Sequence, residues 1–178
     1  MQQQTTKSPW VWERTPDNSA RFVLGTQGRN PLVCFGINPS TAVPDAPDPT
    51  VKRVMSFAAA NGYDSWTMLN IYPQIATNPD DMDEEHRLDL KSENERHIAA
   101  LLAGRPLTLL AAWGNLITKR VYLRSLLQDL VKISAAAGCD WVSLGAPTLK
   151  MHPRHPLYVR GGTPLQRFDM DQYLRRLR

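Results

Sequence analysis

The chain has 178 residues, 42% of them hydrophobic and 21% charged, with a net charge of +4 and a mean hydropathy of -0.38. These values are typical of a globular protein with one substantial core, and no run of about 18 apolar residues predicts a transmembrane helix. Residues 1–7 lack the apolar segment of a signal peptide, so we expect a cytoplasmic protein. We expect a single domain over 1–178, with an N-terminal extension at 1–30 and a core at 31–178.

The N-terminal half predicts a hairpin, a central strand and a helix. Segments 10–13 and 21–24 flank turn-rich residues, which is typical of a β-hairpin. The apolar run 32–37 predicts the first central strand, and a proline-rich loop follows it at 39–49. A helix is then predicted to begin at Asp48-Pro49-Thr50.

The rest of the chain alternates between predicted strands and helices. The strands are expected at 66–71, 107–112 and 140–144, and the helices at 92–103, 118–137 and 170–177. Such alternation predicts βαβ units and a parallel sheet. We therefore predict a three-layer α/β/α sandwich with a four-stranded, mostly parallel sheet and an N-terminal β-hairpin. The acidic stretch at 80–95 is expected to be a solvated loop and helix start.

Two polar, proline-containing turns follow predicted strands. Gly36-Ile37-Asn38-Pro39-Ser40 ends the first central strand, and Met151-His152-Pro153-Arg154-His155-Pro156-Leu157 follows the last strand region. Open α/β sheets bind ligands at the carboxyl ends of their strands, so these turns predict a binding site. Asn38 could orient a water or a ligand there, or bond its own backbone as turn asparagines do.

Further polar and aromatic side chains are candidates for a functional or a structural role. Asn70 ends the second central strand, where its amide could read the edge of a nucleobase or cap the strand. Tyr72 and Phe57 could stack on a flat ligand or belong to the core. Trp113 is expected to pack at the sheet edge, and Asp48 to cap a helix.

His152 and His155 are the candidate catalytic side chains of the C-terminal turn. A histidine can donate a hydrogen bond to a developing anion or transfer a proton near neutral pH. No compact third ligand accompanies the two histidines, so we predict neither a metal nor a cofactor. Cys34 and Cys139 are predicted to be free, buried thiols.

The C-terminal part of the chain is basic, with seven basic and two acidic residues from 148 onward. A basic rim around a cleft suits a phosphate-bearing partner. We therefore expect Lys150, Arg154 and Arg160 to contact nucleic acid, whereas the arginines at 175–178 fit a solvated terminal helix.

Together, the motifs resemble those of the uracil-DNA glycosylase superfamily over about 31–159. Residues 36–39 resemble the first active-site motif of its mismatch-specific branch, and 68–70 resemble the strand whose asparagine reads the flipped base. Residues 152–157 resemble its His-Pro-Ser-Pro-Leu-Ser motif. The chain departs from these patterns at Ser40, where that branch has glycine, and at the additional Arg154.

More closely, the chain resembles a family catalogued as domain of unknown function sixteen forty-three. That family shows Asn-Pro-Ser-Thr-Ala followed by Asp-Pro-Thr, here at 38–42 and 48–50, and Pro-Arg-His-Pro-Leu-Tyr, here at 153–158. The match covers nearly the whole chain and implies a fold more firmly than an activity.

The superfamily resemblance implies metal-independent hydrolysis of an N-glycosidic bond, as in DNA repair or base modification, with DNA or a nucleotide as partner. It implies that Asn38 positions the water, Asn70 reads the base, and either His152 or His155 stabilises the base anion. The remaining residues expected to bind substrate are Gly36, Ile37, Pro39, Ser40, Tyr72 and the wedge Leu157. The alternatives are a non-catalytic module that binds nucleic acid or nucleotides, and a hydrolase or transferase of a small nucleotide.

Overall fold

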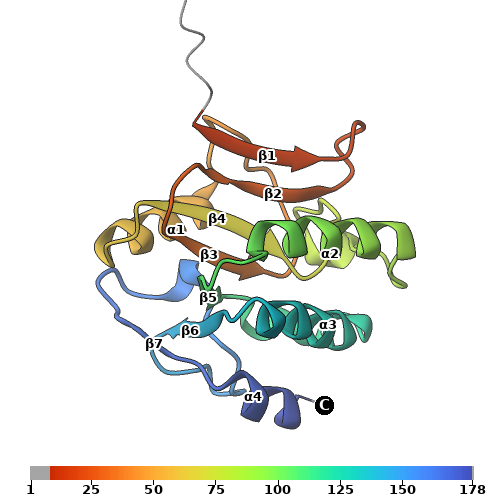
Figure 1. The fold of residues 1–178 in the computed structure, drawn as a ribbon. Helices are drawn as coiled ribbons and strands as arrows, with labels where there is room; N and C mark the ends of the chain where they lie inside the picture. Colours follow the sequence, from red (N-terminus) through yellow and green to blue (C-terminus); the bar gives the residue numbers. More distant parts are fainter. Residues whose placement is uncertain (1–8, 178) are drawn as a thin grey trace, which may run out of the picture.

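The computed structural model describes residues 9–177, and in that range seven strands form one sheet in the order β1-β2-β4-β3-β5-β6-β7 (Figure 1). The strands are β1 (Trp10–Arg14), β2 (Arg21–Thr26), β3 (Pro31–Gly36), β4 (Ser65–Asn70), β5 (Thr108–Ala111), β6 (Asp140–Leu144) and β7 (Leu165–Arg167). The expectation about a signal peptide concerns residues 1–7, which lie outside the described residues.

The four central strands are the four predicted ones, and they are parallel. Strand β4 pairs with β3, β3 with β5, and β5 with β6. The prediction of a four-stranded sheet is nevertheless wrong. Strand β2 pairs antiparallel with β4 and brings β1 with it, and β7 pairs antiparallel with β6. The sheet is therefore mixed, and the predicted hairpin is one of its edges rather than a separate extension.

Four α-helices and three 3-10 helices occur within residues 9–177. They are α1 (Pro49–Ala60), α2 (Leu88–Leu102), α3 (Tyr122–Ala136), α4 (Met170–Arg176), η1 (Pro79–Asp81), η2 (Gly114–Thr118) and η3 (Pro156–Tyr158). Helix α1 begins where the sequence predicts, because the carboxylate of Asp48 accepts the backbone N–H of Val51 and caps the helix.

Helices α2 and α3 differ from their predicted bounds at the N-terminal end. Helix α2 begins four residues before 92, so part of the acidic stretch is helical, and Lys91 and Glu95 form an ion pair one turn apart on it. Helix α3 begins after 118 because residues 114–118 form η2 instead.

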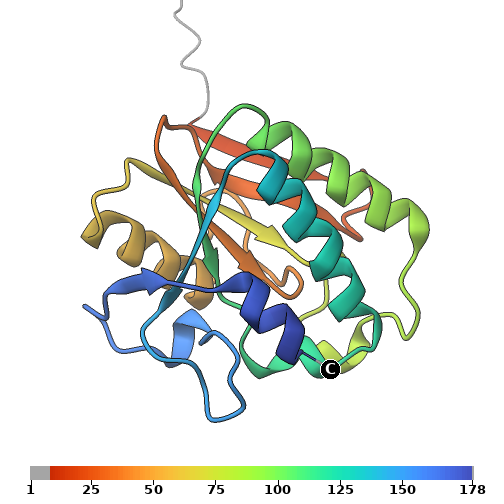
Figure 2. The same cartoon turned by 60° about the horizontal axis from the view of Figure 1, so that its bottom comes forward.

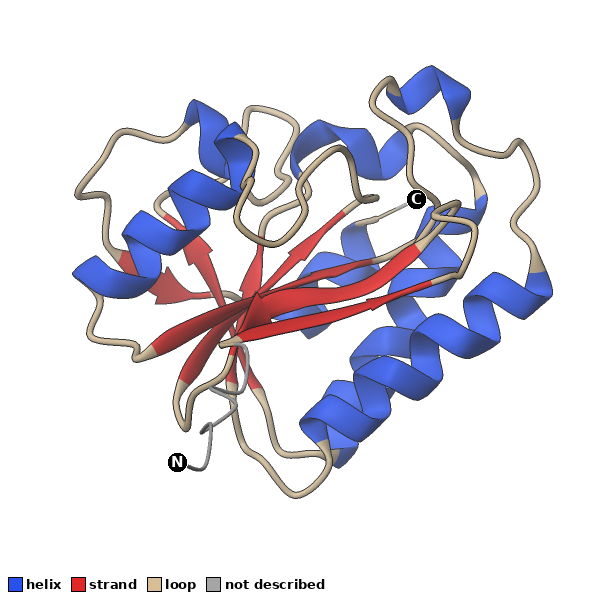
Figure 3. Ribbon diagram, turned by 90° about the horizontal axis from the view of Figure 1, so that it is seen from above, coloured by secondary structure: helices blue, strands red, loops and turns tan. Residues whose placement is uncertain are grey.

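Helices cover both faces of the twisted sheet (Figure 3). On β3, Val33 and Phe35 belong to a core shared with α2 and α3, whereas Leu32 and Cys34 belong to a second core shared with α1. Successive side chains of a strand point to opposite faces, so a strand covered on both sides is a continuous apolar run. The layers are thus α1 on one face, the sheet, and α2 with α3 on the other.

The connections diverge at β3. Helix α1 leads from β3 to β4 on one side, and α2 leads from β4 back to β5 on the other side of β3. In open α/β sheets the crevice at such a topological switch point is the usual place for a ligand. The C-terminal segment 145–160 passes beside α1 (Figure 2), where Arg53 donates hydrogen bonds to the carbonyls of Pro156 and Val159.

Among residues 9–177, no helix has both the length and the apolar character that a membrane span requires. Cys34 is buried in the sheet and Cys139 is half-buried, and both thiols are free. Burial raises the pKa of each thiol, most strongly that of Cys34.

Candidate ligand-binding site

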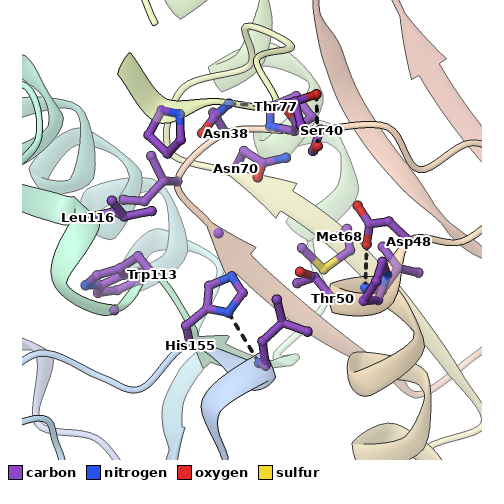
Figure 4. Close-up of a pocket in the computed structure, with 18 of the residues that line it drawn as sticks. Asn38, Ser40, Asp48, Thr50, Met68, Asn70, Thr77, Trp113, Leu116 and His155 are labelled. Carbon is purple, nitrogen blue, oxygen red and sulfur yellow. Dashed lines mark hydrogen bonds between the residues drawn. The ribbon is translucent and has the colours of Figure 1, made fainter. Parts of the chain in front are cut away.

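A pocket of about 760 Å³ lies at the carboxyl ends of the parallel strands (Figure 4). Its walls come from the loop after β3, the N-terminus of α1, the end of β4, η2 and the C-terminal turn. A cavity of this size is typical of small-molecule sites. The structure brings together at this pocket the predicted residues Gly36, Ile37, Asn38, Pro39, Ser40, Asn70, Arg154, His155 and Leu157.

The side chain of Asn38 is fixed by the backbone around it. Its Nδ2 donates to the carbonyl oxygens of Ala76 at 2.8 Å, Pro39 at 3.1 Å and Gln74 at 3.4 Å. Through the bond to Pro39, Asn38 binds the backbone of its own turn, as turn asparagines do. Its Oδ1 has no partner among the described residues and stays available to a water or a ligand. Asn38 therefore offers the pocket one oriented acceptor.

Asn70 is the last residue of β4, and its side chain is 2% exposed. Neither polar atom of its carboxamide has a hydrogen-bond partner among residues 9–177, and Nδ2 is fully buried. Gly36 of the neighbouring strand gives this side chain its room, because a Cβ there would lie 3.1 Å from Oδ1. Buried polar groups are rarely left unpaired, so Asn70 is a candidate ligand contact.

His155 reaches the pocket from the C-terminal turn, and Figure 4 shows its ring directed into the cavity. Its Nδ1 accepts the backbone N–H of Leu157 at 3.3 Å. Burial lowers the pKa of His155, while the charge of Asp48 acts in the opposite direction. The ring is therefore neutral near pH 7, with its proton on Nε2, and it can donate one hydrogen bond.

The N-terminus of α1 and Arg21 of β2 form a further wall of the pocket. The side chain of Asp48 caps the helix there, and Pro49 has no N–H to donate. Arg21 is 3% exposed, and its Nη1 donates to the carbonyl of Ala42 at 2.7 Å. Burial lowers the pKa of Arg21 to about 10, so the guanidinium stays charged at neutral pH.

The structure does not bring His152 to the pocket. It is 7% exposed, and its Nδ1 lies 2.9 Å from the hydroxyl of Tyr173 in α4. That hydroxyl also accepts a hydrogen bond from Trp113 Nε1 at 3.0 Å. An indole only donates, so the hydroxyl proton is free to point at His152 Nδ1. His152 thus ties the C-terminal turn to α4 instead of facing a ligand.

The expectation that Tyr72 stacks on a ligand is also not met. Tyr72 is fully buried, and its hydroxyl donates to Asp83 at 2.6 Å and accepts the backbone N–H of Arg87. Its ring packs against Tyr122 of α3, on the face of the sheet away from α1. Phe57 is likewise buried, in the core under α1. Both aromatic rings therefore belong to the core.

The predicted basic contacts are only partly at the pocket. Arg154 lines it and donates from Nε to the carbonyl of Ala146, whereas Lys150 and Arg160 are exposed and do not line it. Leu157 is 41% exposed at the mouth of the pocket, and Leu149 is the more exposed apolar side chain of this region.

Sequence reasoning missed Arg21 and treated Asp48 and Trp113 as structural. Arg21 opens an apolar strand, and a charged residue at the head of such a run is the one signal that could have pointed to it. Asp48 caps α1 as predicted and lines the pocket as well, as does the fully buried Trp113. Within residues 9–177, no three His, Cys, Asp or Glu side chains cluster closely enough to hold a metal ion.

The chain is an open α/β fold, and its pocket lies at the topological switch point, where sheets of this class usually bind their ligands. The family model described as Protein of unknown function (DUF1643) matches residues 21–157, and the chain belongs to this family. The matched segment contains every pocket-lining residue except Tyr158. Comparison with curated proteins and with solved structures gave no match.

Proposed function

We propose that the pocket binds a nucleobase and that the protein hydrolyses the N-glycosidic bond of that base, as a metal-independent enzyme of the uracil-DNA glycosylase type. The observation that carries the proposal is the carboxamide of Asn70, which is buried in the pocket wall without a protein partner. An unpaired buried donor or acceptor costs about 1–3 kcal/mol. A ligand that pairs with both atoms recovers this cost on binding.

A carboxamide presents one donor and one acceptor side by side. Its complement is an edge that carries an acceptor next to a donor, as nucleobases have on their hydrogen-bonding edges. The apolar side chains of Met68 and Leu116 line the same cavity and supply contact area for a flat ring. These features support a base as the ligand of Asn70.

His155 and Asn38 supply the two further groups that N-glycosidic hydrolysis needs. When the C1′–N bond breaks, its electron pair leaves with the base, and the neutral Nε2–H of His155 can donate to the base oxygen that gains the charge. The oriented Oδ1 of Asn38 can hold the water that adds to C1′. The water hydroxyl then ends on the sugar, and its proton ends on the released base.

The proposed activity is tested by incubating the protein with oligonucleotides that contain uracil, hypoxanthine, xanthine or alkylated bases, and with the matching free nucleosides. We expect release of one of these bases and loss of that release in Asn70→Ala. Asn30→Ala is the matched control, because Asn30 is exposed at the amino end of β3, away from the pocket. No base release by the wild-type protein from any substrate would rule out the hydrolase.

The partner is proposed to be DNA or a nucleotide, and salt separates the two. Exposed Lys150 and Arg160 would contact phosphates of a strand, and such binding weakens steeply with salt because counterions are released. Oligonucleotide binding that falls by orders of magnitude between 50 and 200 mM salt, roughly as expected for several phosphate contacts, would support DNA. Binding of a mononucleotide alone would support the small ligand.

A further inference from the structure

Arg21 is the buried charged group that the base-hydrolysis scheme does not use. Its side chain lines the pocket, although the residue is only 3% exposed. Its Nη1 donates to the Ala42 carbonyl, but its buried Nε has no hydrogen-bond partner among residues 9–177. No carboxylate of the described chain lies within ion-pair distance of Arg21. A buried cation without a paired anion is costly.

Arg120 is an arginine that holds a loop in place, and it shows how many hydrogen bonds such a guanidinium can make in this chain. Its guanidinium donates to the backbone carbonyls of Asp80, Met82, Asp83 and Lys119. Arg21 also holds a loop, through Ala42, but it uses a single carbonyl to do so. The loop-holding role therefore leaves most of the donor capacity of Arg21 unused, at a place that faces the pocket.

The N-terminus of α1 adds donors to the same wall. Val51 N–H is bound to Asp48, and Pro49 has no N–H, so Thr50 keeps the free backbone N–H of the first turn. The hydroxyl of Thr50 also has no partner among the described residues, and Thr50 lines the pocket (Figure 4). The amino end of a helix attracts anions through its dipole.

We propose that Arg21 and the first turn of α1 form a subsite for a phosphate group of the ligand, so that the pocket takes a nucleotide rather than a bare base or a nucleoside. The base end of this ligand rests on the proposed function, through Asn70. The phosphate end rests on Arg21 and Thr50 alone. A free mononucleotide and a strand both carry such a phosphate, and both present the same oxygens to the guanidinium fork.

The charge of the pocket suits such a ligand. Arg21 and Arg154 line it against a single carboxylate, that of Asp48, and one oxygen of Asp48 is already bound to the N–H of Val51. The charge of Asp48 reaches Arg21 through space without forming a close pair. A phosphate placed between Arg21 and Thr50 would complete the hydrogen bonds that both residues leave open.

Calorimetric titrations test the subsite. The ligands are uridine and inosine, their 5′- and 3′-monophosphates, a single-stranded pentanucleotide and inorganic phosphate. We expect a monophosphate to bind at least tenfold more tightly than its nucleoside, about the gain expected from one charge-assisted hydrogen-bonded contact. Arg21→Gln should reduce this gain to twofold or less, while Arg120→Gln, the matched control outside the pocket, should keep it.

A second measurement does not depend on the folding of a variant. In the wild-type protein, the Nε–H resonance of Arg21 should shift on addition of the monophosphate and stay in place on addition of the nucleoside. Pentanucleotide binding that depends on Arg21, without mononucleotide binding, assigns the phosphate to a strand and supports the subsite.

The two proposals fail separately. Equal affinity for nucleoside and monophosphate, with no shift of the Arg21 resonance, overturns the subsite and leaves the base site standing. A shift caused by inorganic phosphate without binding of any nucleoside or nucleotide supports the subsite and counts against the nucleobase. Absence of every one of these responses overturns both.

Discussion

The backbone N–H of Leu157 donates to Nδ1 of His155 at 3.3 Å, within the turn that begins η3. This bond decides the tautomer of His155, because a nitrogen that accepts cannot carry the proton. The proton of the neutral ring therefore sits on Nε2, on the side of the pocket. The motif alone leaves open whether His152 or His155 faces a ligand. The structure places His155 at the pocket and His152 against the hydroxyl of Tyr173.

Replacing the two histidines should give two different results. His155→Ala removes the Nε2 donor from the pocket, and base release is expected to fall by about two orders of magnitude, the usual effect of losing one preorganised donor. His152→Ala removes the partner of the Tyr173 hydroxyl, and the free energy of unfolding is expected to fall by about 1–3 kcal/mol. Single-turnover rates and urea denaturation measure the two effects.

Each variant also provides a control: the stability of His155→Ala and the rate of His152→Ala should change little. His155→Ala should unfold within about 1 kcal/mol of the wild-type protein, and His152→Ala should keep its rate at temperatures where it is folded. A large rate loss in folded His152→Ala would contradict the placement of that residue outside the pocket.

Replacing Asn38 tests the role of its oriented oxygen. In Asn38→Ala the water loses Oδ1, and hydrolysis should fall by about two orders of magnitude, while the dissociation constant for the product base changes by no more than about twofold. The backbone carbonyls of Gln74 and Ala76 lose a donor at the same time, so thermal unfolding must be measured in parallel. Weakened binding with an unchanged rate would assign Asn38 to the ligand instead of the water.

Gly36→Ala should weaken ligand binding through Asn70. The new Cβ would lie 3.1 Å from Asn70 Oδ1, so the carboxamide must move by a few tenths of an ångström from its place. We expect about tenfold weaker binding of the base, the effect of misplacing one hydrogen-bonded pair. Gly161→Ala is the matched control, because its Cβ would meet nothing closer than 3.8 Å. If Gly36→Ala and Gly161→Ala bind the base equally well, Asn70 does not contribute to base recognition.

The parallel core of the fold could be predicted because its signals are local. Residues 140–144 form a short, mostly apolar segment between Gly138 and Gly145, and the predicted strand has the observed bounds. The meeting of Asn38 and Asn70 follows from the same prediction, because Gly36 and Asn70 are paired at the ends of adjacent parallel strands. Two strand ends at one edge of a sheet must lie side by side.

The parts that could not be predicted depend on contacts between distant segments. Strand β7 has three residues and no continuous apolar face, so it forms only because β6 offers an edge. The burial of His152 depends on Tyr173, a residue of a helix that the sequence places without indicating its partner. Arg21 enters the pocket because β2 pairs with β4, and no local pattern encodes that pairing.

Acid should destabilise the fold through its buried histidines. Burial lowers the pKa of His152 and of His155 below the ordinary value of 6.5 in the folded protein. The unfolded chain therefore binds these protons at a higher pH than the folded chain does, and the free energy of unfolding must fall as the pH drops through about 6.5. Urea denaturation at pH 7.5 and 5.5 measures this difference. In His152→Gln, which cannot take up the proton, the difference should be smaller than in the wild-type protein. The same acid range should lower activity, because a protonated His155 carries a proton on Nδ1 and can no longer accept the N–H of Leu157. An unchanged pH dependence of stability in His152→Gln would show that other groups carry it.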